Sequence, residues 1–518
     1  GCASGPTFKD EPVVWRVADD RPIAEPEENP WHPYLYFADL LLFDAIADPL
    51  SLPDAEPAGD VNALDEVPDS TWFANRVGVR QVTPEEAARG PVTIGPPALP
   101  LVITAGKSAG GNPGFFAKDA RGERFLVKFD TVGNPEMQTS VSVIVNRIFW
   151  TAGYHVPEDT IFVFGRGDVA LADDATIEED TGDERAMTAA DLDEVLALAP
   201  RRADGRWRAS ASRFLAGVPK GGWEATGTRD DDPNDRVPHE HRRVLRGLRV
   251  LSAWVSHVDM KEDNTLDMYV GGDDAGRGGH LVHYLVDFGE AMGAHQAEKD
   301  RREDGFEHVW DWGAQARAFV SFGLWVRPWE RQRRTPWRSV GYFAGEPFEP
   351  AAWKEAYPYE PFRRMTPADA YWGAKLVMRF DRPLLEAIVA EGQLSDAAAA
   401  RWVVDALLAR RVAIGKAFLE GLTAFDDVHV AEGRLCGVDL GVLYGLESDG
   451  ALERVDAEGN VLETAVSERG TGAVCVGEVA PEGYAQVTLR MRRGRTLRPP
   501  MIVHLHNGHV VGIIRDAR

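Results

Sequence analysis

Four polar residues stand in an order and in surroundings that suit the handling of a nucleotide. Lys128 ends a short apolar stretch, and Asp287 follows another. Asp259 and Asn264 lie five residues apart, directly after an apolar pattern typical of a buried helix. Transfer of a phosphoryl group requires phosphates to be held, metal ions to be carried and an acceptor hydroxyl to be aligned with a base. Lysine, amide and carboxylate side chains meet these requirements, so the four residues predict a site for a nucleotide and a divalent cation.

The segments around Lys128 predict a small sheet and one long helix. Phe125 and Val127 alternate with Lys128, so the lysine is expected on the opposite face of its strand. Apolar residues then recur with helical spacing over 136–152. An acidic stretch at 173–184 is typical of a solvated loop. Strands are predicted over Leu99–Thr104, Gly114–Lys118, Arg124–Phe129, Thr160–Phe164 and Val169–Ala172.

The loop that contains Asp259 lies between a helix and a hairpin. A strong helical pattern over 238–255 leads directly into this loop. The predicted hairpin turns through 271–279, and its return strand Leu281–Val286 ends at Asp287. A carboxylate at the end of a strand is well placed to bridge a metal ion to phosphates.

Two of these segments resemble motifs of protein kinases. The sequence His-Val-Asp-Met-Lys-Glu-Asp-Asn at 257–264 resembles their catalytic loop, H-x-D-x-K-x-x-N. Asp-Phe-Gly at 287–289 resembles their magnesium-binding motif. The wider sequence is similar to an uncharacterised bacterial branch of this protein-kinase-like superfamily, with a lipoprotein-like start. The resemblance implies a two-lobed kinase-like fold.

The resemblance also implies a role for each polar residue of the loop. Asp259 would be the catalytic base, and Lys261 would act beside it. Asn264 and Asp287 would bind Mg²⁺ or Mn²⁺. The nucleotide would be ATP, and the acceptor would be a hydroxyl group of unknown origin. No A-P-E segment follows Asp287, so the half that binds the acceptor differs from that of an ordinary protein kinase.

Other residues would contact the phosphates of ATP. By the resemblance, Lys128 would contact them and pair with Glu136. The glycine-rich segment before Lys128 departs from the kinase pattern G-x-G-x-x-G. Backbone N–H groups at Gly106, Gly110 and Gly111 could still cover phosphates. The Gly-Lys-Ser run in this segment is not a P-loop, because its first glycine is missing and later Gly and Pro residues prevent the helix.

The chain is long enough for several domains, and its pattern predicts an α+β fold with an added all-β domain. Residues 366–420 are mostly helical, and the tail alternates apolar and polar residues. The predicted divisions are a tether at 1–30, a helical or irregular extension at 31–95, a kinase-like N-lobe with an acidic insertion at 96–235, a C-lobe at 236–425 and a small β-sandwich or barrel at 426–518.

Composition excludes some functions. The chain has 518 residues and a net charge of −25, which disfavours nucleic-acid binding and adhesion to anionic membranes through basic patches. No apolar run is long enough for a membrane-spanning helix.

The cysteines bear on location. The start Gly1-Cys2 resembles the cleavage junction of a bacterial lipoprotein, so we expect export to the cell envelope with a lipid on Cys2. An arbitrary start and a cytoplasmic location are the alternative. Cys436 and Cys475 are candidates for a disulfide, with two buried thiols as the other possibility.

Three functions fit this sequence. The first is an ATP- and Mg²⁺-dependent phosphotransferase that acts on a hydroxyl of a protein or small molecule. The alternative is a catalytically silent envelope lipoprotein that binds a ligand or partner. Nucleotidyl transfer by the same residues is a third hypothesis. Seven tryptophans between 310 and 372 are expected at the acceptor site or, more simply, in the core.

Overall fold

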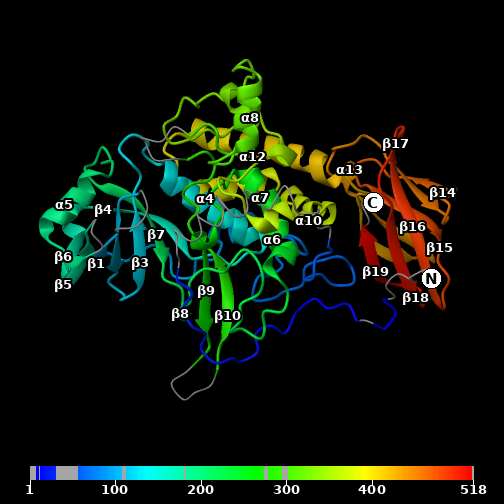
Figure 1. Ribbon diagram of the computed structural model, residues 1–518, viewed down its shortest axis with the longest axis horizontal. Helices are drawn as coiled ribbons and strands as arrows, with labels where there is room; N and C mark the ends of the chain where they lie inside the picture. Colours follow the sequence, from blue (N-terminus) through cyan, green and yellow to red (C-terminus); the bar gives the residue numbers. More distant parts are fainter. Residues whose placement is uncertain are drawn as a thin grey trace.

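The computed structural model shows two strand-rich regions with helices between them (Figure 1). The N-terminal sheet lies at one end of the molecule, and the C-terminal strands, orange and red, lie at the other. Cys2 and the first part of the predicted extension, 31–55, lie outside the residues that the structure describes. The described residues are 8–10, 12–30, 56–107, 112–179, 183–272, 278–294 and 301–515.

Seven strands form the N-terminal sheet. They are β1 (Leu101–Gly106), β2 (Gly114–Lys118), β3 (Arg124–Lys128), β4 (Asp159–Phe164), β5 (Val169–Glu178), β6 (Glu184–Ala186) and β7 (Trp207–Arg213). Their order is β4-β7-β3-β2-β1-β5-β6, and all neighbours are antiparallel except β1 and β5. Phe125 and Val127 are buried in the core of this sheet. Lys128 therefore lies on the opposite face, as the alternation predicts.

Two parts of this sheet differ from the prediction. The acidic stretch at 173–184 predicts a loop, but β5 continues to Glu178 and pairs with β6. Backbone pairing on both sides of β5 outweighs the polarity of its side chains. The strand β7 is not evident from the sequence, because its run of Ala and Ser has low strand propensity. Pairing with β3 and β4 holds it in place, and Ala209 and Ala211 are completely buried there.

A buried ion pair attaches helix α4 (Met137–Ala152) to both the sheet and the helical region. Arg208 Nη1 lies 3.3 Å from Asp130 Oδ2, and both residues are buried. The same carboxylate accepts a hydrogen bond from the backbone of Thr139 at 2.9 Å. Arg208 Nη2 donates to the carbonyl oxygen of Gly392 at 2.6 Å. The helices near the sheet are α3 (Pro84–Arg89), α4 (Met137–Ala152) and α5 (Ala189–Ala197).

The centre of the molecule is helical. The pattern predicted as one helix over 238–255 is divided into η4, α6 and α7. Gly247, between α6 and α7, packs against Trp372, where an added Cβ would come within 2.6 Å of the indole ring. The α-helices are α6 (Arg243–Arg246), α7 (Leu248–Val255), α8 (Trp312–Val320), α9 (Glu360–Arg363), α10 (Pro367–Met378), α11 (Arg382–Glu391) and α12 (Ala397–Ile414). The shorter turns are η3 (Arg166–Asp168), η4 (His239–His241), η5 (Glu262–Asn264), η6 (Pro328–Arg331), η7 (Pro350–Ala352) and the π-helical η8 (Gly415–Leu419).

The C-terminal region is built almost entirely of strands, as the alternating pattern predicts. Two sheets share an apolar core, one of order β11-β12-β15 and one of order β14-β13-β16-β18-β19, with β17 paired to β16. A short helix, α13 (Leu440–Leu443), follows β12. The strands are β11 (Phe425–Ala431), β12 (Arg434–Asp439), β13 (Ala451–Val455), β14 (Val461–Val466), β15 (Ala473–Glu478), β16 (Tyr484–Arg493), β17 (Thr496–Leu497), β18 (Met501–His506) and β19 (His509–Arg515).

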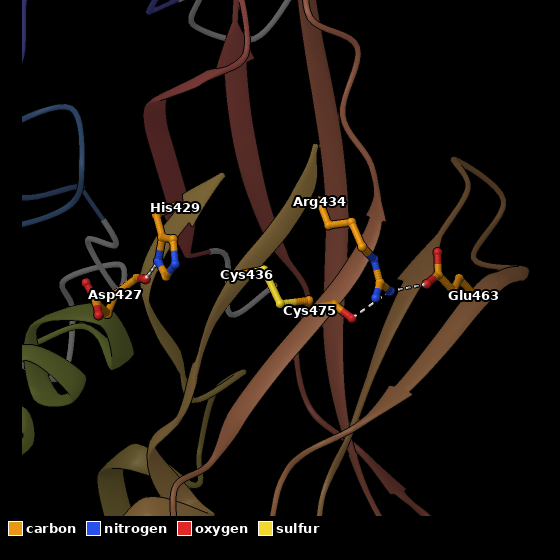
Figure 2. Close-up of a disulfide and its surroundings, with 6 residues drawn as sticks. All are labelled: Asp427, His429, Arg434, Cys436, Glu463 and Cys475. Atoms are coloured by element: carbon orange, nitrogen blue, oxygen red, sulfur yellow. Dashed lines mark hydrogen bonds and ion pairs between the residues drawn. A yellow bond between two sulfur atoms is a disulfide. The ribbon is translucent and has the colours of Figure 1, made fainter. Parts of the chain in front are cut away.

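A disulfide and a buried ion cluster stabilise this region. Cys436 and Cys475 are bonded across β12 and β15, which confirms the predicted pair (Figure 2). Arg493 of β16 pairs with Glu420 at 2.8 Å and with Asp439 at 2.6 Å, and all three side chains are buried. Because Glu420 directly follows η8, this cluster joins the strands to the end of the helical region.

None of the helices in the described part of the chain is both long and apolar enough to cross a bilayer.

Candidate functional site

A hairpin brings the two kinase-like segments together. The strands β8 (Val218–Pro219), β9 (Thr265–Val270) and β10 (His280–Leu285) form a three-stranded sheet in the order β10-β9-β8. Thr265 begins β9 and is paired with Leu285, the last residue of β10. The backbone N–H of Val286 then donates to the carbonyl oxygen of Asn264 at 3.0 Å. Asn264 and Asp287 therefore lie at the same end of the hairpin.

The C-terminus of α7 positions the loop that contains Asp259. Ser256 has a left-handed backbone with φ of 49°, which ends the helix. The buried guanidinium of Arg410 donates to the carbonyl oxygens of Ala253 and Trp254, each at 2.7 Å. A cation at a helix C-terminus is favourable because the last carbonyl groups carry partial negative charge. Burial lowers the pKa of Arg410 to about 9, which leaves the side chain charged at neutral pH.

Within the loop, two side chains hold the Asp259 carboxylate. Lys261 Nζ lies 3.1 Å from each carboxylate oxygen. Asn264 Nδ2 donates to Asp259 Oδ2 at 2.8 Å and to the Asp259 carbonyl oxygen at 2.6 Å. Burial lowers the pKa of Lys261, but the charge of Asp259 outweighs it and raises the pKa above its usual value. The Asp259 side chain remains 18% exposed, so a substrate can reach it.

A buried aromatic group supports the loop from beneath. His257 is buried, and its ring lies 5.7 Å from Phe288 and 5.8 Å from Phe149. Phe288 stacks on Phe149 of α4 at 5.3 Å. Burial lowers the pKa of His257 to about 4, although the charges of Asp259 and Asp287 oppose this shift. His257 is therefore neutral at physiological pH, and its role is packing.

Lys128 reaches the same place from the N-terminal sheet. Its Nζ lies 2.9 Å from Asp287 Oδ2. Asp287 has a left-handed backbone with φ of 57°, and about half of its side chain is exposed. Burial raises the pKa of the Asp287 carboxyl, but the nearby Lys128 and Lys107 more than offset this, so its pKa lies below the usual value. The carboxylate is ionised, as a metal ligand must be.

Lys107 belongs to this site although the sequence does not single it out. It follows β1 directly, and its Nζ donates to the carbonyl oxygen of Asn112 at 3.1 Å. Burial lowers its pKa to about 8, and the charge of Lys128 lowers it in the same direction, against the opposing charge of Asp287. The Gly-Lys-Ser run is the available signal, but its surroundings exclude the P-loop in which such a lysine would bind phosphate.

The pairing of Lys128 with Glu136 is wrong. Glu136 precedes α4 with a left-handed backbone, φ 66°. Its carboxylate accepts hydrogen bonds from the backbone and hydroxyl of Ser395, both at 2.9 Å. Glu136 therefore joins α4 to the turn before α12, and Asp287 is the partner of Lys128.

The glycine-rich segment is described only in part. An added Cβ on Gly106 would come within 2.8 Å of the Ile177 side chain on β5. Close packing between neighbouring strands thus explains the glycine at this position. Gly110 and Gly111 lie outside the described residues.

The oxygen atoms at the hairpin end suit a hard divalent cation. The described residues contain no cluster of three or more His, Cys, Asp or Glu side chains that could hold a metal by themselves. Mg²⁺ does not require one, because it is commonly bound by one or two protein oxygens together with phosphates and water. The Asn264 amide uses its Nδ2 on Asp259, which leaves its oxygen as a potential ligand at the same end of the hairpin as Asp287. The donor set therefore fits Mg²⁺ or Mn²⁺ bound with a nucleotide.

Comparison with known proteins gives limited similarity. No known family matches the sequence, and no curated protein does either. Among solved structures, two crystal structures of the Golgi casein kinase are similar, one of them with Mn/ADP bound. Each is 8% identical, with a TM-score of 0.31 over 62% of this chain and 72% of the other. Similarity this low carries no inference about activity or site residues.

Proposed function

We propose that this chain is an ATP- and Mg²⁺-dependent phosphotransferase that acts on a hydroxyl group of a protein or small molecule. The observation that supports this best is the meeting of three separate segments at one end of the β9–β10 hairpin. They contribute the Lys128–Asp287 ion pair and the Asp259–Asn264 hydrogen bond. No requirement of folding places these polar groups together, and each has a use in phosphoryl transfer.

In this proposal, Lys128 and Lys107 bind phosphate oxygens, and Asn264 and Asp287 hold the metal ion. The metal ion, when bound with ATP, offsets the negative charge that shifts onto the departing ADP. The oxygen of the acceptor hydroxyl forms a bond to the γ-phosphorus while the bond between that phosphorus and ADP breaks. Asp259 accepts the proton that the hydroxyl loses. Lys261, at 3.1 Å from both carboxylate oxygens, holds Asp259 in one orientation.

Transfer of label from ATP tests this function. The purified chain is incubated with Mg²⁺ and ATP labelled on the γ-phosphoryl group, with serine-rich peptides, sugars and polyols as acceptors. We expect Asp259→Asn to reduce transfer by at least about 100-fold, as loss of a catalytic base does, while MgATP binding is retained. Equal transfer by the variant and the wild type would exclude Asp259 as the base. Label transferred from the α-position instead would show nucleotidyl transfer.

A second candidate, a catalytically silent binding module, is favoured by the position of Glu136. Its carboxylate is engaged by Ser395 at 2.9 Å, so it does not hold Lys128 in the way the kinase pattern implies. Under this hypothesis MgATP binds, and no acceptor or water receives phosphate above the rate without protein. Any Asp259-dependent transfer excludes it.

We propose that the protein is exported, and the disulfide supports this location. Disulfides persist in oxidising compartments and are rare in reducing ones. The Cys436–Cys475 bond is therefore expected to be present in cells. Alkylation of free thiols in whole cells, followed by a gel-shift assay, tests this. Fully reduced Cys436 and Cys475 would contradict export.

A further inference from the structure

Helix α8 and the loop that follows it carry large apolar side chains that face solvent. Their exposed fractions run from 68% to 93%, far above the values of side chains in a protein core. These five residues, called the α8 tip below, are Trp312, Phe319, Val320, Phe322 and Leu324. Contiguous exposed apolar side chains mark interaction surfaces, since isolated ones are common but clusters are not.

The local fold holds the tip away from the body of the molecule. Asp311 begins α8 by accepting a hydrogen bond from the backbone of Ala314 at 2.8 Å, and Ala314 is the only buried residue of the helix. After the helix the chain turns at Phe322 and Gly323, both with positive φ. In Figure 1, α8 and this turn stand at the edge of the molecule, above the other helices. The pocket lined by Gly313, Ala314 and Arg317 of α8 includes none of the five side chains of the tip.

The segment that carries the tip has a charge opposite to that of the whole chain. Residues 309–338 contain six arginines and two acidic residues, a net charge of +4 in a chain of −25. Arg331, Arg333 and Arg338 are exposed. Charges further away than the Debye length of about 8 Å at physiological salt are largely screened, so a basic segment can attract anions although the whole chain is acidic. The expectation from net charge alone, that anionic membranes are avoided, does not apply here.

The composition of this segment is typical of peptides that lie in a membrane interface. Five of the fifteen tryptophans of the chain fall within 309–338. Tryptophan is enriched at the boundary between lipid and water, and arginine binds anionic headgroups next to inserted Phe and Leu side chains. The helix α8 has nine residues, too few to span a bilayer, so it can only lie at the surface.

We propose that the α8 tip docks the protein onto a bilayer that contains anionic lipid. The apolar side chains of the tip enter the headgroup region, and the arginines after the tip contact lipid phosphates. A protein partner would be expected to meet polar groups that fix its orientation, and the tip presents almost none between Phe319 and Leu324. This inference is independent of the proposed catalytic function, because none of these residues lies at the nucleotide site.

Vesicle flotation tests the proposal with the full chain purified without any attached lipid. Vesicles of phosphatidylcholine are compared with vesicles that also contain phosphatidylglycerol. We expect binding to the anionic vesicles, weakened at high salt. The triple variant Phe319→Ser, Phe322→Ser and Leu324→Ser should weaken it by about 100-fold or more, since three large apolar side chains no longer insert. The control Leu462→Ser and Val466→Ser removes similarly exposed side chains from β14 and should bind as the wild type does.

The possible results distinguish a bilayer from a second copy of the chain as the partner of the α8 tip. The triple variant changes only exposed side chains, so its melting temperature should match that of the wild type. Failure of the wild type to bind either kind of vesicle would overturn the proposal. So would vesicle binding that survives the triple substitution. A wild-type dimer that the triple variant converts to a monomer, without vesicle binding, would show instead that the tip binds a second copy of the chain.

Discussion

The position of Lys107 predicts that nucleotide affinity depends on pH above neutrality. In the free protein, burial and the nearby charge of Lys128 lower the pKa of Lys107 to about 8. Phosphates bound beside it would favour the charged lysine and raise this pKa toward its ordinary value. Above pH 8, binding must therefore take up a proton. Raising the pH opposes proton uptake, so affinity falls as the pH rises.

The size of the effect follows from the two protonation states. With a pKa of about 8, Lys107 is mostly charged at pH 7 and mostly neutral at pH 9. If the bound state keeps the lysine charged at both pH values, the affinity for MgATP falls about tenfold between them, or about 1.4 kcal/mol. MgATP keeps the same charge over this range, so the ligand does not contribute to the change.

Isothermal titration calorimetry measures this directly. Titrations at pH 7 and pH 9, each in buffers of different ionisation enthalpy, give both the affinity and the number of protons taken up. The variant Lys107→Met should bind more weakly at pH 7 and lose the pH dependence. Lys118→Met is the matched control, because Lys118 lies on β2 and is exposed to solvent. Equal affinity of the wild type at both pH values, or a tenfold fall that persists in Lys107→Met, would refute this reasoning.

Three further predictions concern stability and the site. Arg208→Ala leaves the Asp130 carboxylate buried without its partner, and we expect a loss of about 3–5 kcal/mol in the free energy of unfolding, measured with urea. Replacing Cys436 and Cys475 with serine opens a loop of 39 residues, and the chain-entropy model predicts a loss of about 4 kcal/mol, seen as earlier unfolding of the C-terminal strands. The double serine variant should be as stable as the wild type in which the disulfide has been reduced. Glu136→Gln should have an affinity for MgATP within about twofold of the wild-type value by calorimetry, because the Glu136 carboxylate binds the turn before α12. A tenfold loss of affinity would show that Glu136 pairs with Lys128 when the nucleotide is bound.

Local sequence patterns predict the elements around the site well. The strand β2 has the predicted bounds, and α4 begins within one residue of its prediction. The hairpin β9–β10 is predicted as well, and in the structure its return strand alternates between buried and partly exposed residues. Short-range periodicity determines such elements, and so they are visible in a single sequence.

Features that depend on distant contacts were not predictable in this way. The middle of strand β7 is a run of Ala and Ser with low strand propensity, and its neighbours β3 and β4 hold it in place. The partner of Lys128 is Asp287, which lies on another segment, while the nearer Glu136 faces Ser395. Lys107 comes to the site because its backbone pairs with Gly114 at the start of β2, and Gly114 lies opposite Lys128 on β3. Motifs in the sequence suggest what each side chain does, whereas the partner of each side chain is determined by the tertiary fold.

In the proposed function, Lys128, Asn264 and Asp287 form a site for a nucleotide with a divalent cation. Calorimetry of ATP binding in the presence and absence of Mg²⁺, on the wild type and on Asp287→Ala, tests it most directly. We expect binding that requires Mg²⁺ in the wild type and a loss of affinity of at least about tenfold in the variant. Absence of nucleotide binding in the wild type, or metal-dependent binding unchanged in Asp287→Ala, would contradict it.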